Sequence, residues 1–275
     1  MAIIDFLRNK LVKRNPLVIF LLGFTASLLG VGTAYIVFPQ NVGLMGLAFA
    51  SLILQPFVSK LIYYEEESGY REKRLSRKIF KDHSQTFRTI LLLFFGIMLS
   101  YSVMYLYSKD IRVNDRFESQ LQPAFESAGL ASGASCSQGW GCFIQYLQNN
   151  LMVMVVVLIL SSAYGAGAVL FLGWNASVWG TVFAYFAVNA SASGGTKTAA
   201  FISIFVKIFP HTFLEASAYF LAVISGIIIT KAYLREKIES GRFRFIILDG
   251  LLFFALAILM VILGAGWEAF IFPVT

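Results

Sequence analysis

The longest uncharged stretch of the chain sets the strongest limit on its fold. No charged side chain occurs between Arg14 and Lys60. A helix crosses a hydrocarbon layer about 30 Å thick with about 20 apolar residues, because each residue adds about 1.5 Å. The stretch is therefore long enough for two crossings, and Pro39 in its middle predicts a turn between them. We expect an N-terminal transmembrane hairpin with helices at residues 17–38 and 42–62.

The composition of the whole chain is typical of polytopic membrane proteins. Its 275 residues are 58% hydrophobic and only 13% charged, and the mean hydropathy is +0.73, which is outside the range of a soluble globular domain. The net charge of +7 would suit nucleic acid, but the basic residues form short clusters beside apolar runs, as membrane topology requires. We therefore expect the lipid bilayer as a partner and no nucleic acid.

Five further apolar stretches complete the predicted bundle. They cover residues 88–109, 150–172, 176–190, 211–230 and 245–270. The Gly-Trp-Asn sequence at 173–175 separates two of them, and Pro210 marks the start of another. The stretch 176–190 is short, which leaves a full crossing and a re-entrant segment as alternatives. The predicted fold is all-α: a polytopic transmembrane helix bundle of about seven spans, in which the hairpin precedes a five-span core.

The basic residues agree with this count and predict an orientation. Cytoplasmic loops of membrane proteins carry an excess of Lys and Arg. With a cytoplasmic N-terminus, the 22 Lys and Arg residues fall on the cytoplasmic side with the exception of Lys109, Arg112, Arg116, Lys197 and Lys207. One span more or fewer would place the basic cluster at residues 231–244 on the wrong side. We expect a multi-pass protein of the cell membrane with an exterior C-terminus.

This topology divides the chain into three parts. Residues 1–62 form the hairpin, residues 63–87 a charged cytoplasmic helix, and residues 88–275 the core, which includes an exterior loop at 109–146. The charged helix mixes Glu with Lys and Arg, and it is either a solvated connector or a docking site for a cytosolic partner. The exterior loop is too small for an independent enzyme domain.

The two cysteines of the chain lie close together in the exterior loop. Cys136 and Cys142 occur in the sequence Cys-Ser-Gln-Gly-Trp-Gly-Cys. An oxidising compartment would let them pair, so we predict a small disulfide loop, with two free thiols as the alternative. Metal binding at the cysteines is disfavoured, because the chain has only two histidines and His83 falls on the cytoplasmic side. We predict no metal site and no cofactor.

The most informative polar residues lie in the stretch after Pro210. His211 and Glu215 are one helical turn apart, and an ionisable pair inside a membrane segment usually marks a functional site. Three small residues continue on the same stripe and predict close helix packing, namely Ala218, Ala222 and Gly226. The alternative is that His211 and Glu215 only form hydrogen bonds that make packing specific.

Other polar residues are predicted at the same depth. In the expected topology Asn149 and Asn150 begin a span on the exterior side, and Glu268 ends the last span on that side. Glu215 lies about one turn inside the same surface. We therefore predict an exterior-facing cavity, which binds a protein partner or an ion. Its lining would be Asn149, Asn150, His211, Glu215 and Glu268.

The segment from Thr86 to Phe272 resembles the stage II sporulation protein M family of integral membrane proteins. The resemblance depends on Phe143-Ile-Gln-Tyr-Leu-Gln-Asn-Asn150 at the start of a span and on Pro210-His-Thr-Phe-Leu-Glu215. It implies that Asn150, His211 and Glu215 are signature positions. It also implies a membrane component of an envelope-remodelling assembly, which holds peptidoglycan-cleaving partners at the exterior membrane face. Thr212 departs from the glycine that usually follows the histidine.

Three classes of function are compatible with a polytopic chain of this kind. We expect a non-enzymatic membrane scaffold that organises partner proteins at its exterior face for envelope or membrane remodelling, with a homo-oligomer as a further possibility. The alternative is a permease or channel subunit with His211 and Glu215 as an ion-responsive pair. An intramembrane enzyme is disfavoured, because the sequence has no two-histidine zinc motif and no recognisable nucleophile arrangement.

Overall fold

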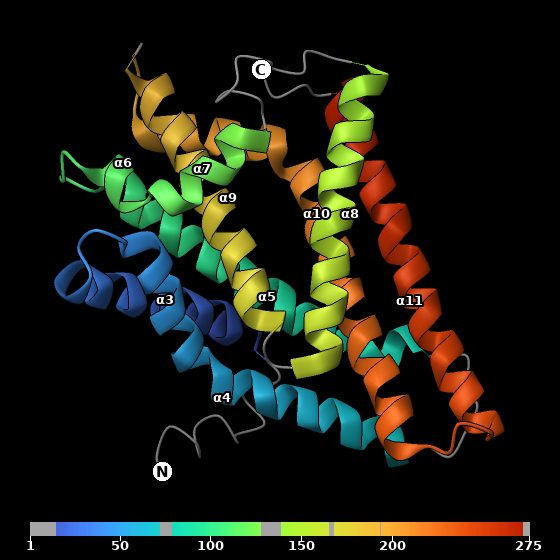
Figure 1. The fold of residues 1–275 in the computed structure, drawn as a ribbon. Helices are drawn as coiled ribbons and strands as arrows, with labels where there is room; N and C mark the ends of the chain where they lie inside the picture. The colour runs from blue at the N-terminus through green and yellow to red at the C-terminus, as the bar shows by residue number, and fades with distance from the viewer. Residues whose placement is uncertain (1–14, 72–78, 128–138, 165–167, 193, 272–275) are drawn as a thin grey trace. The chain divides into compact units, whose positions relative to one another are not determined.

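The computed structural model describes residues 15–71, 79–127, 139–164, 168–192 and 194–271 (Figure 1). The described residues are almost entirely helical, and none of them forms a strand. The long helices are α3 (Pro16–Val37), α4 (Val42–Arg71), α5 (Ile79–Leu106), α8 (Trp140–Tyr164), α9 (Ala168–Ser191), α10 (Lys197–Arg235) and α11 (Gly241–Gly266). Two short helices, α6 (Val113–Arg116) and α7 (Glu118–Ser127), follow α5, and the π-helical turn η2 (Trp267–Ile271) continues α11.

The predicted class of fold is confirmed. Five of the helices are long and apolar enough to cross a membrane: α3, α5, α8, α10 and α11. The apolar part of α4, Val42–Val58, is shorter. Helix α3 begins and ends within one residue of the predicted 17–38, and its start is capped by Asn15, which accepts a hydrogen bond from the backbone N–H of Leu17. Helix α4 begins at the predicted Val42 but continues to Arg71, past the predicted end at residue 62. The number of seven spans stays a prediction.

The predicted break at residues 173–175 is wrong. Helix α9 runs through it without interruption, so the predicted bounds 150–172 and 176–190 do not match the helices. Gly173 serves packing here: a Cβ at this position would lie 2.9 Å from Cδ1 of Leu47. A glycine that lets another helix approach closely looks the same in a sequence as one that ends a helix.

Pro210 also fails to start a helix. It lies inside α10, which begins at Lys197. A proline has no backbone N–H, so the carbonyl of Val206 loses its helical partner, yet long membrane helices tolerate this loss when neighbouring groups compensate. The charged segment also belongs to long helices. Residues 63–71 continue α4 and residues 79–87 begin α5, while residues 72–78 lie outside the described part.

The chain forms two compact units, each assembled from several segments. The first unit contains Met1–Phe57, Leu92–Ser135 and Leu172–Phe209, and the second contains Val58–Leu91, Cys136–Phe171 and Pro210–Thr275. The first unit holds α3, the apolar part of α4, most of α5, the short helices α6 and α7, and most of α9. The second unit holds α8, α11, η2 and the part of α10 that begins at Pro210.

Close backbone contacts pack the helices within the first unit. A Cβ at Gly30 would lie 2.4 Å from the carbonyl oxygen of Gly46, and one at Gly96 would lie 2.3 Å from the carbonyl oxygen of Phe20. Neither position has room for a side chain, so α3 touches α4 and α5 through backbone atoms. Such contacts are how membrane helices gain packing energy when lipid is as apolar as their side chains.

Candidate functional site in the second unit

Helix α10 supplies two ionisable side chains on one face. His211 and Glu215 are one turn apart, and they are 8% and 5% exposed. The position of Glu215 depends on the neighbouring helix α11. A Cβ at Gly264 would lie 3.2 Å from Cγ of Glu215, so the glycine allows α11 to pass directly beside the carboxylate side chain.

The third ionisable side chain comes from the end of α11. Glu268 belongs to the π-helical turn η2, a kind of turn that is often found at functional sites. The backbone N–H of Gly139 donates to the carbonyl of Ala269 at 3.4 Å, and the Trp140 and Phe143 rings pack on Phe270. These contacts tie η2 to the start of α8 and thereby hold Glu268 in place.

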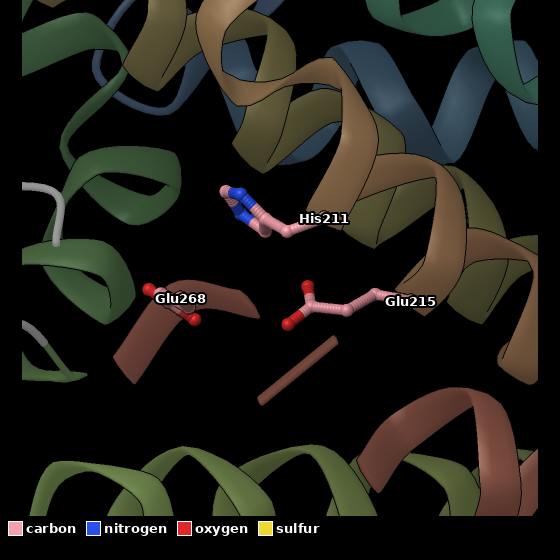
Figure 2. Close-up of side chains that lie close together, drawn as sticks. All are labelled: His211, Glu215 and Glu268. Carbon is pink, nitrogen blue, oxygen red and sulfur yellow. The ribbon is translucent and has the colours of Figure 1, made fainter. Parts of the chain in front are cut away.

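The three side chains converge. One ligand atom each from His211, Glu215 and Glu268 lies within 4.8 Å of the other two. Figure 2 shows the imidazole and the Glu215 carboxylate extending from α10 in the same direction, toward Glu268. Glu215 and Glu268 are far apart in the sequence. They come together because α11 passes beside α10 at Gly264, close to Glu215.

A short hydrogen-bond relay holds the Glu215 carboxylate. Asn150 of α8 donates from Nδ2 to Oε1 of Glu215 at 2.5 Å. Tyr219, one turn after Glu215 on α10, donates from its hydroxyl to Oδ1 of Asn150 at 2.7 Å. Both Asn150 and Tyr219 are buried. The relay fixes the amide orientation of Asn150 and leaves one Glu215 oxygen, Oε2, without a partner in the relay.

The structure therefore joins four of the five predicted site residues, Asn150, His211, Glu215 and Glu268. Asn149 is not among them. Its side chain is exposed, because successive residues of a helix point about 100° apart and Asn150 takes the inward position. Tyr219 was not predicted. Its spacing of four residues from Glu215 is the signal that would have found it.

The three small residues of the same helix are all buried. Ala218 and Ala222 are fully buried, and a Cβ at Gly226 would lie 2.9 Å from the carbonyl oxygen of Leu158 in α8. Two hydrogen bonds between helices accompany this packing. The Ser225 hydroxyl donates to the carbonyl of Gly250 and the Thr230 hydroxyl to that of Ser162, each at 2.7 Å. The packing places α10 against both α8 and α11, which is what brings the site together.

The predicted disulfide stays a prediction. Cys142 is buried near the start of α8, and Cys136 lies outside the described residues.

The chemistry of the site follows from its charges. It combines one imidazole with two carboxylates, and in the described part of the chain neither carboxylate forms an ion pair with Lys or Arg. Buried carboxylates without a cation are costly in a membrane protein, so such a group either takes up protons or binds a cation. The arrangement can therefore bind positive charge.

The fold and the comparisons together define the class. The helices and their hydropathy describe an integral membrane protein with a buried polar site between helices. A family model described as stage II sporulation protein M matches residues 89–273, which is more than half of the chain and contains all four joined site residues. The chain belongs to this family. No curated protein and no solved structure shows a significant match.

Proposed function

We propose that this protein is a non-enzymatic membrane scaffold that organises partner proteins at the exterior face for envelope or membrane remodelling. The observation that supports it most directly is the attachment of the segment after α5 to the membrane helices. Residues 107–127, which we call the platform, follow the candidate span Phe87–Leu106 and contain α6 and α7. The positive-inside rule predicts that this segment is exterior.

A buried aromatic side chain anchors the platform. Phe117 is fully buried, and its ring packs edge-on against Tyr101 and Tyr105 of α5, at centroid distances of 6.1 Å and 5.7 Å. Pairs of this geometry add to the stabilisation that burial itself provides. Gln120 is buried as well, beside Gly43 at the start of α4. The platform is therefore part of the packed first unit.

Polar contacts fix the platform at a second point. The Arg116 guanidinium pairs with Asp110, donates to the carbonyl of Pro39 at 3.1 Å, and lies 5.1 Å from the centre of the Tyr35 ring. Within the platform, Ile111 is 98% exposed. An exposed apolar side chain on an anchored segment suits the docking of a partner protein, because less conformational freedom is lost on binding.

Photo-crosslinking in the native cells tests the scaffold. A photoreactive amino acid at Ile111 should capture the same non-self envelope protein in repeated experiments. The control position is Leu259 of α11, which is 48% exposed within a candidate span and should capture lipid or nothing. Phe117→Ala should abolish capture at Ile111 while the protein remains in the membrane, because the platform loses its anchor. Capture at Ile111 of self-adducts and lipid alone would contradict the proposal.

The buried site favours a second candidate function, a permease or channel subunit. Ionisable side chains within membrane helices commonly line ion or proton pathways. Here His211, Glu215 and Glu268 supply such groups at one level. Ion flux through the purified protein in proteoliposomes, lost in Glu215→Gln and kept in Asp249→Asn, would support this function over the scaffold. A wild-type protein that conducts no ion would count against it.

A further inference from the structure

We propose that His211, Glu215 and Glu268 together bind one divalent transition-metal ion, with Zn²⁺ as the best-suited ion. This site is independent of whether the protein acts as a scaffold or a permease. It also departs from the absence of a metal that the sequence alone predicts, because Glu268 is distant from the His211–Glu215 pair along the chain and only the fold brings it near.

The spacing of the three ligand atoms is suitable for a metal after a small adjustment. They lie within 4.8 Å of one another. Ligand atoms about 2.0–2.2 Å from a tetrahedral Zn²⁺ stand roughly 3.3–3.6 Å apart. Rotations of two glutamate side chains, each with several free torsions, close a difference of this size without movement of the helices.

The buried imidazole points independently to a ligand. His211 is more than nine-tenths buried, and its side chain makes no hydrogen bond to any residue within the described ranges. A polar side chain in such a buried position usually has a partner in native proteins. Figure 2 shows the imidazole on the same side of α10 as the Glu215 carboxylate. A metal ion between the three side chains would accept the free nitrogen as a ligand.

The charge balance leads to the same conclusion. Two carboxylates and no paired Lys or Arg leave the group with an excess of negative charge, at least within the part of the chain that the structure describes. A divalent cation neutralises two carboxylates completely. A nitrogen ligand beside two oxygen ligands favours Zn²⁺ and its first-row neighbours over Mg²⁺ and Ca²⁺, which prefer oxygen alone.

The hydrogen-bond relay has the character of an outer coordination shell. Residues that ligate a metal are usually held by hydrogen bonds from a second layer of side chains. Asn150 holds one oxygen of Glu215, and Tyr219 holds Asn150. Three protein ligands leave a coordination position for water or another small ligand. The metal would also cross-link α10 to the η2 turn.

The test uses the full-length, untagged protein in nanodiscs after removal of metal with a chelator. Zn²⁺ is added back, the bound metal is counted by elemental analysis, and the affinity is measured by calorimetry. We expect one Zn²⁺ per chain. Glu268→Gln and His211→Ala should each weaken binding by more than about 100-fold, since loss of an outer-shell partner already costs about 10–100-fold. The matched control is Asp249→Asn, a carboxylate of α11 outside the group, which should bind like the wild type.

A second measurement separates loss of the site from loss of the fold. Zn²⁺ should raise the melting temperature of the wild type and of Asp249→Asn, and it should leave that of Glu268→Gln unchanged although the metal-free proteins melt alike. Co²⁺ in place of Zn²⁺ should give visible absorption bands that Glu268→Gln abolishes. Equal Zn²⁺ binding by the wild type and by folded Glu268→Gln would overturn the proposal, as would the absence of binding by the wild type.

Discussion

The two compact units bury their helices in different ways. In the first unit, glycines such as Gly30 and Gly96 bring helix backbones into direct contact. Polar side chains link helices in both units, but Tyr101 and Ser102 of the first unit donate to backbone carbonyls. In the second unit the relay from Tyr219 through Asn150 to Glu215 joins one side chain to another. The difference teaches that substitutions in the first unit should act through steric fit, whereas those around the site should act through unpaired polar groups.

The largest effect of substitution is expected at a backbone contact of the first unit. In Gly30→Ala the new Cβ would meet the carbonyl oxygen of Gly46 and the backbone nitrogen of Ala50, which is 2.8 Å away, so α3 and α4 must separate. We expect a loss of about 3 kcal/mol, at the upper end of the usual cost of overpacking. The free energy of unfolding in mixed micelles measures it.

The same helix offers a matched control. A Cβ at Gly32 would have no atom within 4 Å, so Gly32→Ala should be neutral or slightly stabilising. Equal destabilisation by the two substitutions would show that the backbone contact at Gly30 is not the cause, and the contrast between the units would lose its basis.

A smaller effect is expected in the relay of the second unit. Asn150→Ala removes the donor to Glu215 and the acceptor of Tyr219, so two buried polar groups lose their partners. The expected cost is roughly 2 kcal/mol, because an unsatisfied buried group typically costs about 1–3 kcal/mol. Chemical denaturation of both variants checks this, with Asn149→Ala as the control. Asn149 is exposed, and its substitution should change stability by less than about 0.5 kcal/mol.

The smallest effect concerns one hydrogen bond between helices. Ser225→Ala removes the donor to the carbonyl of Gly250 without opening a large cavity. Hydrogen bonds of this kind in membrane proteins contribute about 0.6 kcal/mol on average. The free energies of unfolding of the wild type and of Ser225→Ala, compared under the same conditions, measure the contribution of this hydrogen bond. A cost above about 2 kcal/mol would mean that polar contacts dominate the second unit more than the comparison assumes.

Hydropathy and residue spacing predicted a large part of this architecture. The end of α3 and the start of α4 follow from a single proline between two apolar runs. The grouping of Asn150, His211, Glu215 and Glu268 follows from their equal depth in the predicted topology, without knowledge of which helices are neighbours. The depth of a residue within a span follows from its number of residues from the end of that span, so the sequence alone predicts it.

What failed depends on neighbours in space. Gly173 and Pro210 have the sequence signature of helix ends, but both lie within helices, and Gly173 packs against Leu47. The choice between Asn149 and Asn150 depends on the rotation of α8, which two adjacent asparagines do not reveal. The anchoring of the platform by Phe117 depends on tyrosines of another helix, and a phenylalanine in a polar segment gives no sign of them.

Gly264 limits the space that is available to the Glu215 side chain. Its missing side chain leaves just enough space for Glu215, so a single methyl group added there would displace the carboxylate by a few tenths of an ångström and leave every charge unchanged. The added methyl group would also restrict the rotation of the Glu215 side chain, which metal coordination needs more than proton uptake does, because the ligands of a metal must reach fixed distances. Gly264→Ala should therefore weaken metal binding at the site while leaving proton uptake unchanged, which separates the two kinds of chemistry.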